Sequence, residues 1–299
     1  MTRTRPAKQS YAVEFRNVFV SFEAQPVLID VSFKLRPGGM MILTGESGSG
    51  KSVLLRLAMG LEKPDTGEIL INGRDISCLG ESDLLAIRGG LMGMVFQEDS
   101  LFTGLSVYDN VAYRLDEHGW SEEDTDKAVN EVLRFVGLDG EGKKLPEELS
   151  GGMKRRLEIA RALVGWPSIM LFDEPTMSLD PIVALQVLDL ILRARDINHI
   201  SSIYVTKKPM EIPYLANCFA TGTDNGIVVA EAPADDLPDV TIIVLEAGRI
   251  VFSGSLESFE SSDLPSVKRM LTLDTHDHDA DPYFEDPWDK SRVAHEKLL

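Results

Sequence analysis

Cysteine is scarce in this chain of 299 residues, which contains only Cys78 and Cys218. Two cysteines are too few for a disulfide framework, and they cannot by themselves complete a structural zinc site. Such scarcity is typical of a reducing compartment, where thiols stay unpaired. We therefore expect both cysteines to be buried thiols that pack as small apolar side chains.

Basic side chains are also under-represented. The sequence has 30 Lys and Arg against 48 Asp and Glu, which gives a formal net charge of -18. A protein that binds nucleic acid without sequence preference needs clustered Lys and Arg to displace counterions. The composition therefore argues against nucleic acid as a partner of the protein as a whole.

Long hydrophobic runs are missing as well. No stretch approaches the roughly 18 consecutive apolar residues that mark a membrane span. Residues 1–10 form a basic tail that lacks the apolar segment of a secretory signal. Any role at a membrane must therefore come through a partner, although a hydrophobic content of 43% is ample for a sizeable core.

The first part of the chain predicts two kinds of sheet. Residues 11–35 alternate in short strand-like runs and Asn72-Gly73 is a hairpin signal, so we expect a small antiparallel layer. The apolar run Met40 to Leu43 predicts a buried strand, which a glycine-rich turn connects to a helix. The apolar face expected for that helix consists of Val53, Leu54, Leu57 and Leu61.

The rest of the chain predicts a helical lobe and then a parallel α/β arrangement. The pattern is helical over about residues 101–149, with Ser121 as an N-cap, and strands then alternate with helices. Residues 221–240 are acidic and rich in Gly and Pro, which is typical of a surface insertion. We expect one domain over residues 11–273, followed by an acidic tail over residues 274–299.

The sequence GESGSGKS, from Gly45 to Ser52, fits the phosphate-binding pattern G-x-x-x-x-G-K-[ST]. Its glycines let backbone N–H groups converge on phosphate oxygens, and the following helix N-terminus favours an anion. Lys51 is expected to reach the β and γ phosphates, and Ser52 to ligate magnesium. The residues predicted to bind a nucleotide here are Gly45, Glu46, Ser47, Gly48, Ser49, Gly50, Lys51, Ser52 and Val53.

Two adjacent carboxylates, Asp173 and Glu174, follow the buried run Ile169 to Phe172. A magnesium nucleotide needs a carboxylate on its metal at the end of a neighbouring strand, and Asp173 has that place. Glu174 is the expected general base, which would polarise the water that attacks the γ-phosphate. The alternative is that both carboxylates only cap a strand.

The segment LSGGMKRRLEIARALVG, from Leu149 to Gly165, contains a second anion site, because Ser150 can cap a helix that Gly151 and Gly152 open. Together with the phosphate loop and LFDEPT, it resembles the ATPase subunits of ABC transporters over about residues 11–271. The resemblance implies a P-loop NTPase of ABC type, with a mostly parallel sheet core, an antiparallel β layer and an inserted helical subdomain. It also implies a homodimer in which the signature helix of one subunit closes over the ATP and Mg²⁺ of the other.

Further roles follow from the resemblance alone. It implies that Phe22 stacks on adenine, that Gln97 senses magnesium and the attacking water, and that Asp180 contacts the opposite subunit. The alternative for Phe22 is a residue of the strand core. The family usually has a histidine where this chain has Lys207, and a lysine there could still donate to phosphate. Met177-Ser178 is a milder departure, because small residues and glycine are more common there.

A narrower resemblance concerns the cargo. Met153 in the signature, the segment after Gln97 and the helix-like LPSVKRML are similar to the ATPases of MCE-type lipid transport systems, including the Mla phospholipid-trafficking family. This implies permease subunits in the membrane, an MCE-domain lipid-binding partner, and phospholipid or a similar hydrophobic cargo. It also implies a cytoplasmic location, peripheral on the inner face of the cell membrane.

Three alternatives remain open at the level of sequence. The chain could serve a transporter for a polar solute, whose ATPase would look much the same in its first half. It could be a non-transport ATPase, although such proteins generally carry two nucleotide domains or a long coiled coil. It could also be a weakly hydrolysing switch or assembly subunit, which Lys207 favours and an intact Glu174 disfavours.

The acidic tail has two interpretations. His276 and His278 stand among aspartates and are compatible with metal binding, although such segments are more often solvated and disordered. Tyr283, Phe284 and Trp288 could instead dock on a second subunit and stabilise the dimer.

Overall fold

A six-stranded sheet forms the centre of the molecule, with the strand order β12-β11-β3-β8-β7-β6. The computed structural model describes residues 10–278 apart from 99, 224–225 and 234–236. The five strands from β11 to β6 pair in parallel, and β12 joins β11 antiparallel. The strands are β3 (Met40–Thr44), β6 (Met92–Val95), β7 (Ile169–Asp173), β8 (Ser201–Val205), β11 (Val240–Glu246) and β12 (Arg249–Gly254).

Four of these strands, β3, β6, β7 and β8, are buried at every residue. A parallel sheet covered on both faces needs such near-continuous apolar runs, which explains why Met40 to Leu43 and Ile169 to Phe172 could be recognised as strands. Successive side chains of β3 then enter two different cores. Met40 and Ile42 pack with the apolar residues of α3 to α6, whereas Met41 and Leu43 pack with those of α1 and the antiparallel layer.

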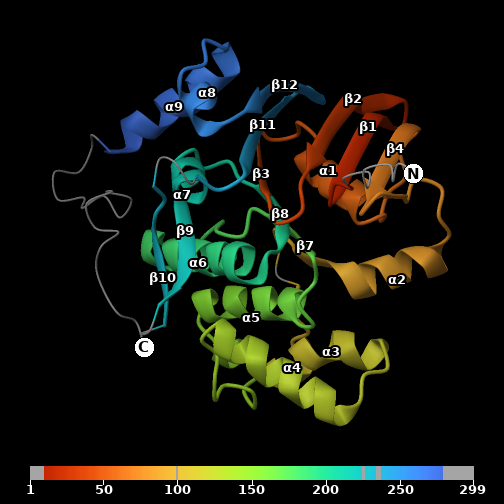
Figure 1. The fold of residues 1–299 in the computed structure, drawn as a ribbon, viewed down its shortest axis with the longest axis vertical. Coiled ribbons are helices and arrows are strands. Elements are labelled where there is room, and N and C mark those ends of the chain that lie inside the picture. The colour runs from red at the N-terminus through yellow and green to blue at the C-terminus, as the bar shows by residue number, and fades with distance from the viewer. Residues whose placement is uncertain (1–9, 99, 224–225, 234–236, 279–299) are drawn as a thin grey trace, which may run out of the picture.

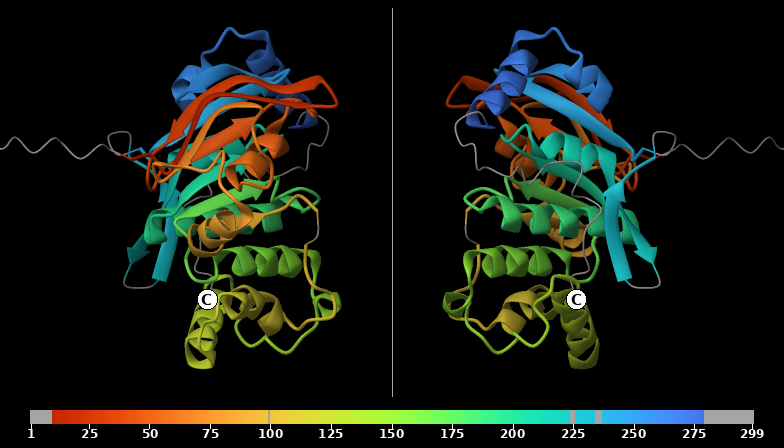
Figure 2. Two further views of the ribbon diagram at one scale, coloured as in Figure 1. Left: turned by 90° about the vertical axis from the view of Figure 1, so that its right-hand side faces the viewer. Right: turned by 90° about the vertical axis from the view of Figure 1, so that its left-hand side faces the viewer.

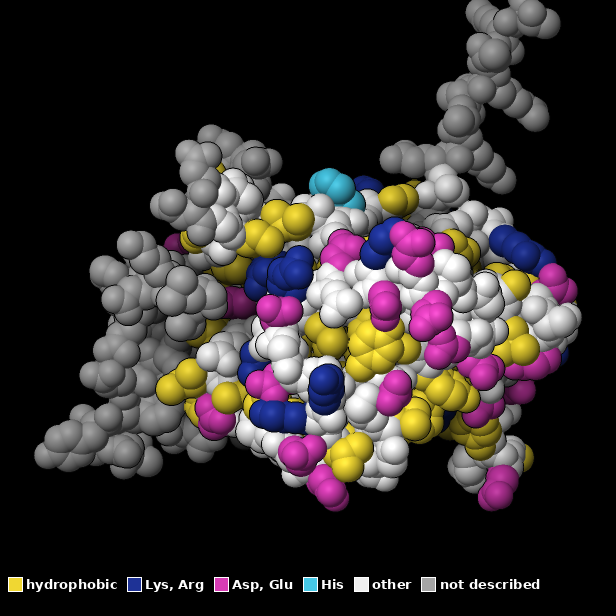
Figure 3. Space-filling view, turned by 90° about the horizontal axis from the view of Figure 1, so that it is seen from below, with side chains coloured by type: hydrophobic (Ala, Val, Ile, Leu, Met, Phe, Trp, Pro, Cys, Tyr) yellow, Lys and Arg dark blue, Asp and Glu magenta, His cyan; other side chains and the backbone are white. Residues whose placement is uncertain are grey.

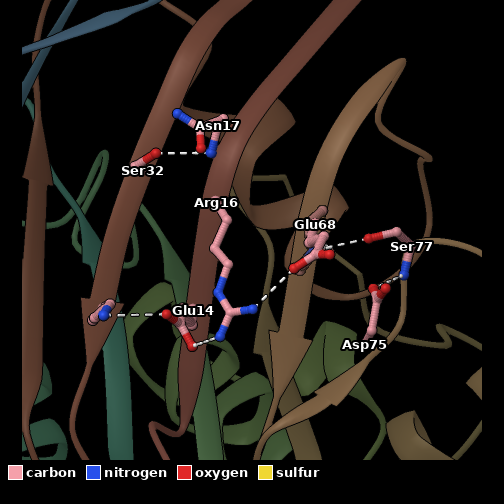
Figure 4. Close-up of polar contacts among 9 residues, drawn as sticks. Glu14, Arg16, Asn17, Ser32, Glu68, Asp75 and Ser77 are labelled. Carbon is pink, nitrogen blue, oxygen red and sulfur yellow. Dashed lines mark hydrogen bonds and ion pairs between the residues drawn. The ribbon is translucent and has the colours of Figure 1, made fainter.

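The antiparallel layer has the strand order β2-β1-β4-β5. Its strands are β1 (Val13–Phe22), β2 (Gln25–Leu35), β4 (Thr66–Ile71) and β5 (Arg74–Asp75). The predicted hairpin turn is confirmed, since Asn72 and Gly73 both have positive φ, at 48° and 79°. Figure 4 shows Arg16 of β1 between Glu14 and Glu68, to which it donates at 2.9 Å each. The Arg16–Glu68 pair ties β1 to β4, but both of its partners are exposed, so it adds little stability.

The helices cover both faces of the central sheet (Figure 1). They are α1 (Lys51–Ala58), α2 (Glu81–Leu91), α3 (Val107–Glu117), α4 (Glu122–Phe135), the 3-10 helix η1 (Pro146–Glu148), α5 (Gly151–Leu163), α6 (Pro181–Asn198), α7 (Glu211–Asn217), α8 (Leu256–Glu260) and α9 (Pro265–His278). None of the helices in the described part of the chain is long and apolar enough to cross a membrane.

The predicted helical lobe consists of α3 and α4, which lie at one end of the molecule with α5 between them and α6 (Figure 2). Ser121 caps α4 by accepting a hydrogen bond from the Asp124 N–H at 3.2 Å, as the sequence indicated. Gly137 follows the helix with φ of 69°. Seen from below, the face that includes the lobe carries many acidic side chains with apolar side chains between them (Figure 3). The expected fold class, with its inserted helical subdomain, is confirmed.

Two expectations need correction. Leu61 does not extend the apolar face of α1, because that helix ends at Ala58 and Leu61 is 47% exposed. Cys218 is buried, but Cys78 is exposed, since it lies in the turn after β5. Residues 221–240, which are expected to form a surface insertion, contain most of a hairpin formed by β9 (Cys218–Thr223) and β10 (Gly226–Glu231), and β10 is exposed or half-buried throughout.

Helix α9 continues to His278 and so includes the first residues of the segment expected to be an acidic tail, 274–299. The side chains of His276 and His278, together with Tyr283, Phe284 and Trp288, lie outside the described residues, so metal binding and docking by the tail stay predictions. Among the described side chains, no group of three or more His, Cys, Asp or Glu is arranged to hold a metal ion.

Candidate functional site

The phosphate loop connects β3 to α1 through three glycines with positive φ. Gly45 has φ of 143°, and a Cβ there would lie 2.1 Å from the Leu245 carbonyl oxygen, so the close approach of two chain segments requires glycine. Gly50, with φ of 104°, is the N-cap of α1, and no described side chain caps this helix. Its first turn also lacks an acidic residue. The N–H groups that begin α1 are therefore available to an anion.

Lys51 is held on the loop that it follows. Its Nζ donates to the carbonyl oxygens of Gly45 at 2.7 Å and Glu46 at 2.8 Å, and its side chain is buried. Burial lowers the pKa of Lys51, and the positive charge of Lys207 lowers it further, while the two carboxylates of the site oppose the shift. An ammonium in this position is prearranged for a phosphate, which would relieve its desolvation.

Asp173, the last residue of β7, is buried at the carboxyl end of the sheet. Its Oδ1 has no hydrogen-bond partner among the described residues, which is costly for a buried carboxylate oxygen. Burial raises the pKa of Asp173, and a hydrogen bond with Ser52 opposes that shift. A carboxylate oxygen without a partner beside a serine hydroxyl is the donor set that Mg²⁺ prefers. Asp173 and Ser52 therefore fit a magnesium ion, which would neutralise phosphate charge there.

Glu174 follows Asp173 directly, and an unusual backbone conformation orients its side chain. Its φ of 48° is rare for a residue other than glycine, and its N–H donates to the Val205 carbonyl at 3.1 Å. The side chain is largely buried, and Oε1 forms an ion pair with Lys207 Nζ at 2.7 Å. The structure thus brings together the expected base and the residue at the usual histidine position.

Gln97, just after β6, contacts Met177 and helix α5. Its Nε2 donates to the Met177 sulfur at 3.3 Å. Its carbonyl and that of Phe96 accept from Arg155 of α5, at 3.5 and 2.9 Å. Helix α5 therefore holds the backbone at Gln97.

The residues expected to reach a second subunit lie close together. Ser150 caps α5 by accepting from the Met153 N–H at 3.3 Å, and Gly151 and Gly152 open that helix. Asp180 caps α6 by accepting from the Val183 N–H at 3.0 Å. A Cβ on Gly152 would lie 2.6 Å from Val183 Cγ1, so the two helix starts pack against each other.

Phe22 ends β1 and is 40% exposed. Its exposure argues against the alternative that it belongs to the strand core. Asp65 holds the hairpin that carries Phe22 in place, because the Ser21 N–H and hydroxyl both donate to Asp65 Oδ2, at 2.7 and 2.6 Å. An exposed ring on a fixed hairpin can stack on a flat partner.

One group near the site was missed by sequence reasoning. The Glu211 carboxylate is fully buried and accepts hydrogen bonds from the hydroxyls of Thr176, Tyr204 and Thr206, the latter two at 2.7 and 2.6 Å. Burial and the nearby carboxylate raise the pKa of Tyr204. The one signal in the sequence is that Thr176 and Thr206 follow the ends of two adjacent strands, as Glu174 and Lys207 do.

Comparison with known proteins now decides the family. Residues 28–177 match the profile of the ABC transporter family. The chain belongs to this family. A methionine import ATP-binding protein MetN from Leifsonia xyli is 35% identical over 87% of this chain and 70% of its own length. The chloroplastic protein TRIGALACTOSYLDIACYLGLYCEROL 3 from Arabidopsis thaliana is 36% identical over 87% of this chain and 73% of its own length.

Solved structures agree with this assignment. The dimeric ATP-binding cassette MJ0796, in a post-hydrolysis state with ADP and Pi, aligns with a TM-score of 0.67 and 26% identity. The alignment covers 82% of this chain and 98% of that one. The chain spans only 50 to 58% of three further methionine import proteins. This chain is an ATP-binding subunit of an ABC transporter and an ATPase that uses ATP and Mg²⁺. Such cassettes work in pairs, together with membrane permease subunits.

Proposed function

We propose that this cassette hydrolyses ATP with Lys51, Ser52, Asp173, Glu174 and Gln97 in one chain. The observation that carries the proposal is the unsatisfied Oδ1 of Asp173, buried beside Ser52 at the carboxyl end of β7. In an open α/β sheet, ligands bind at this edge.

Each of these residues has a distinct task in the proposed reaction. Lys51 and the N–H groups of the loop Gly45 to Ser52 hold the phosphates, because they supply positive charge without a competing acidic group in the first turn of α1. Glu174 accepts a proton from the water that attacks the γ-phosphate, since its backbone conformation fixes it beside Asp173. Gln97 orients that water and reports its presence to α5 through the Arg155 contacts.

We propose that the site is completed by a second copy of the chain. Ser150, Gly151, Gly152 and Asp180 lie around two packed helix starts. The start of α5 has no acidic residue in its first turn and offers N–H groups that favour an anion. In this arrangement the start of α5 in one copy covers the γ-phosphate held by the other. The dimeric state of the similar cassette MJ0796 supports this proposal.

A cleft beside the lobe is the proposed contact for a permease. It has a volume of about 330 Å³ and its lining includes Leu85, Phe102, Tyr113 and Arg161. The first three are 54%, 41% and 45% exposed, an unusual gathering of apolar surface. Arg161 also contacts Ser100, three residues after Gln97, so a change at the nucleotide site could alter the contact with a partner in the cleft. The proposed location follows from this contact: the inner face of a cell membrane, on the cytoplasmic side.

The cargo that we propose is a phospholipid or a similar hydrophobic molecule, delivered through an MCE-type partner. Support comes from Met153 and the segment after Gln97, which are similar to the ATPases of MCE-type lipid transport systems. Further support comes from a relative named after the glycerolipid trigalactosyldiacylglycerol. Methionine is the second candidate, because a relative of comparable identity is named for methionine import.

A reconstitution distinguishes the two cargoes. The full chain is purified with its permease, placed in proteoliposomes, and its ATP turnover is measured with added phospholipid-loaded MCE domain or with methionine and its binding protein. Lipid transport predicts that turnover rises only with the lipid-loaded partner. A rise that occurs only with methionine would contradict the lipid assignment while leaving the ATPase assignment intact.

A further inference from the structure

Helix α9 brings a basic side chain to the phosphate loop from a distant part of the sequence. Arg269 Nη2 lies 2.9 Å from Glu246 Oε1 and 3.4 Å from Glu46 Oε1. Glu46 is the second residue of the loop that begins at Gly45, and Glu246 is the last residue of β11. One guanidinium therefore faces two carboxylates at the edge of the sheet where a nucleotide is expected.

The two carboxylates meet because of the strand pairing. Strands β3 and β11 pair in parallel, with Thr44 opposite Val244. Glu46 and Glu246 each follow these paired residues by two positions, so both emerge at the carboxyl edge of the sheet. Both place negative charge beside a loop that has to hold phosphate anions, and this charge would repel a phosphate.

The position of Arg269 follows from the packing of α9. Val267 is fully buried and Ser266 is 7% exposed, while Met270 packs against the core under the helix. The hydroxyl of Thr44, the residue just before the phosphate loop, donates to the Met270 sulfur at 3.9 Å. Helix α9 is therefore seated against the start of the loop, and its packing brings the guanidinium to the two carboxylates.

Glu46 connects Arg269 to the phosphate-binding lysine. Its backbone carbonyl accepts from Lys51 Nζ at 2.8 Å, while its carboxylate pairs with Arg269. The Glu46 side chain is 66% exposed, and in the described part of the chain Arg269 is the one residue that forms an ion pair with it. Without Arg269, an uncompensated carboxylate would stand on the loop beside the phosphates that Lys51 holds.

We propose that Arg269 is a positioning residue of the nucleotide site, which neutralises the Glu46 carboxylate and holds it toward α9. The loop can then bind phosphates although it carries an acidic side chain. Helix α9 is in this way a part of the nucleotide site, even though it lies outside residues 28–177, which match the family profile. The inference rests on the proposed function, because it requires a nucleotide at the Gly45 to Ser52 loop.

The test is calorimetric titration of the full chain with ADP and Mg²⁺, because ADP carries phosphates and is not consumed. At about 0.05 M salt, Arg269→Gln should weaken ADP binding by roughly three- to ten-fold, since the Glu46 charge would be left uncompensated. At about 0.5 M salt the loss should shrink to less than about two-fold, because exposed charges are screened. A purely structural role of Arg269 would not be cancelled by salt.

The loss must depend on Glu46. In Glu46→Gln, ADP should bind at least as tightly as in wild type, and adding Arg269→Gln should then change the affinity by less than about two-fold. Arg269→Lys keeps the positive charge and should stay within about two-fold of wild type, because a single nitrogen of Arg269 makes both contacts.

Lys268→Gln is the matched control. Lys268 is the preceding residue on α9 and its side chain is 59% exposed, as is that of Arg269, but it pairs with Asp263 at 2.6 Å. The control removes the same charge from the same helix, and ADP affinity should change by less than about two-fold.

Three results would overturn the proposal. They are an unchanged affinity for ADP in Arg269→Gln at low salt, a loss that persists with Glu46→Gln or at high salt, and an equal loss in Lys268→Gln. If folded wild type does not bind ADP at all, the proposed function fails and the inference with it. Melting curves confirm folding, and Arg269→Met, which keeps an apolar stem, replaces Arg269→Gln if that variant does not fold.

Discussion

Arg155 and Glu158, one turn apart on α5, form a buried ion pair of 2.7 Å that holds the segment after Gln97. The Arg155 side chain is 8% exposed and that of Glu158 is 1% exposed. Arg155 donates to the Phe96 carbonyl, while Glu158 accepts from the Ser100 N–H at 2.8 Å. The helix that begins with Ser150 is therefore coupled to the segment that carries Gln97, through charges removed from water.

Glu158→Gln should lower the free energy of unfolding by about 3 kcal/mol, because Arg155 would remain buried without its ionic partner. Denaturant unfolding measures this loss. Glu123→Gln is the control, since Glu123 forms an exposed pair with Lys127 and should cost less than about 0.5 kcal/mol. Equal losses of unfolding free energy in the two variants would mean that the buried pair stabilises the fold no more than the exposed pair does.

Asp173→Asn should stabilise the nucleotide-free protein at neutral pH by about 1 kcal/mol. Burial raises the pKa of Asp173 above its ordinary 3.8, so the folded state binds this proton more tightly than the unfolded state. The resulting contribution to stability is present below pH 3.8 and is lost as pH rises through the raised pKa. Thermal melts of wild type and variant across acidic to neutral pH should therefore diverge as pH rises. Divergence in the opposite sense would contradict the burial of an ionised carboxylate.

Gly45→Ala should reduce nucleotide affinity by roughly ten-fold or more, because the new methyl group would collide with the Leu245 carbonyl and strain the loop. Gly104→Ala is the matched control, since its Cβ would meet nothing within 4 Å. Binding of a fluorescent ATP analogue measures both. Wild-type affinity in Gly45→Ala would show that the loop does not require this close approach.

Glu211→Gln should destabilise the protein by about 2 kcal/mol, since an amide replaces one acceptor oxygen with a donor that faces hydroxyl groups. Tyr204→Phe removes a single donor from the same carboxylate and should cost about 1 kcal/mol. Urea unfolding compares them. A smaller loss for Glu211→Gln than for Tyr204→Phe would contradict the role of Glu211 as the shared acceptor.

Much of the fold could be predicted because local chemistry determines it. The continuous apolar runs at β3 and β7, the Asn72-Gly73 turn and the cap at Ser121 each have one favourable conformation. The fold class was therefore accessible from sequence, as were the positions of Lys51 and Asp173, because the ends of parallel strands meet at one edge.

Other features depend on contacts between distant residues. Nothing in the local sequence of Lys207 indicates that its ammonium lies 2.7 Å from Glu174, 33 positions earlier. The partners of Glu211 are likewise brought together only by the pairing of β7 with β8. Leu61 was misjudged because helical periodicity does not show where α1 ends, and Cys78 because its exposure depends on the turn after β5.

Magnesium-dependent phosphate release by the full chain with its permease tests the central claim most directly. Wild type is compared with Glu174→Gln, and with Glu117→Gln as an exposed control on α3. The account predicts turnover by wild type and by Glu117→Gln, and a loss of at least about a hundred-fold in Glu174→Gln, the usual range for a general base. Undiminished turnover in Glu174→Gln would contradict the assignment of Glu174 as the base.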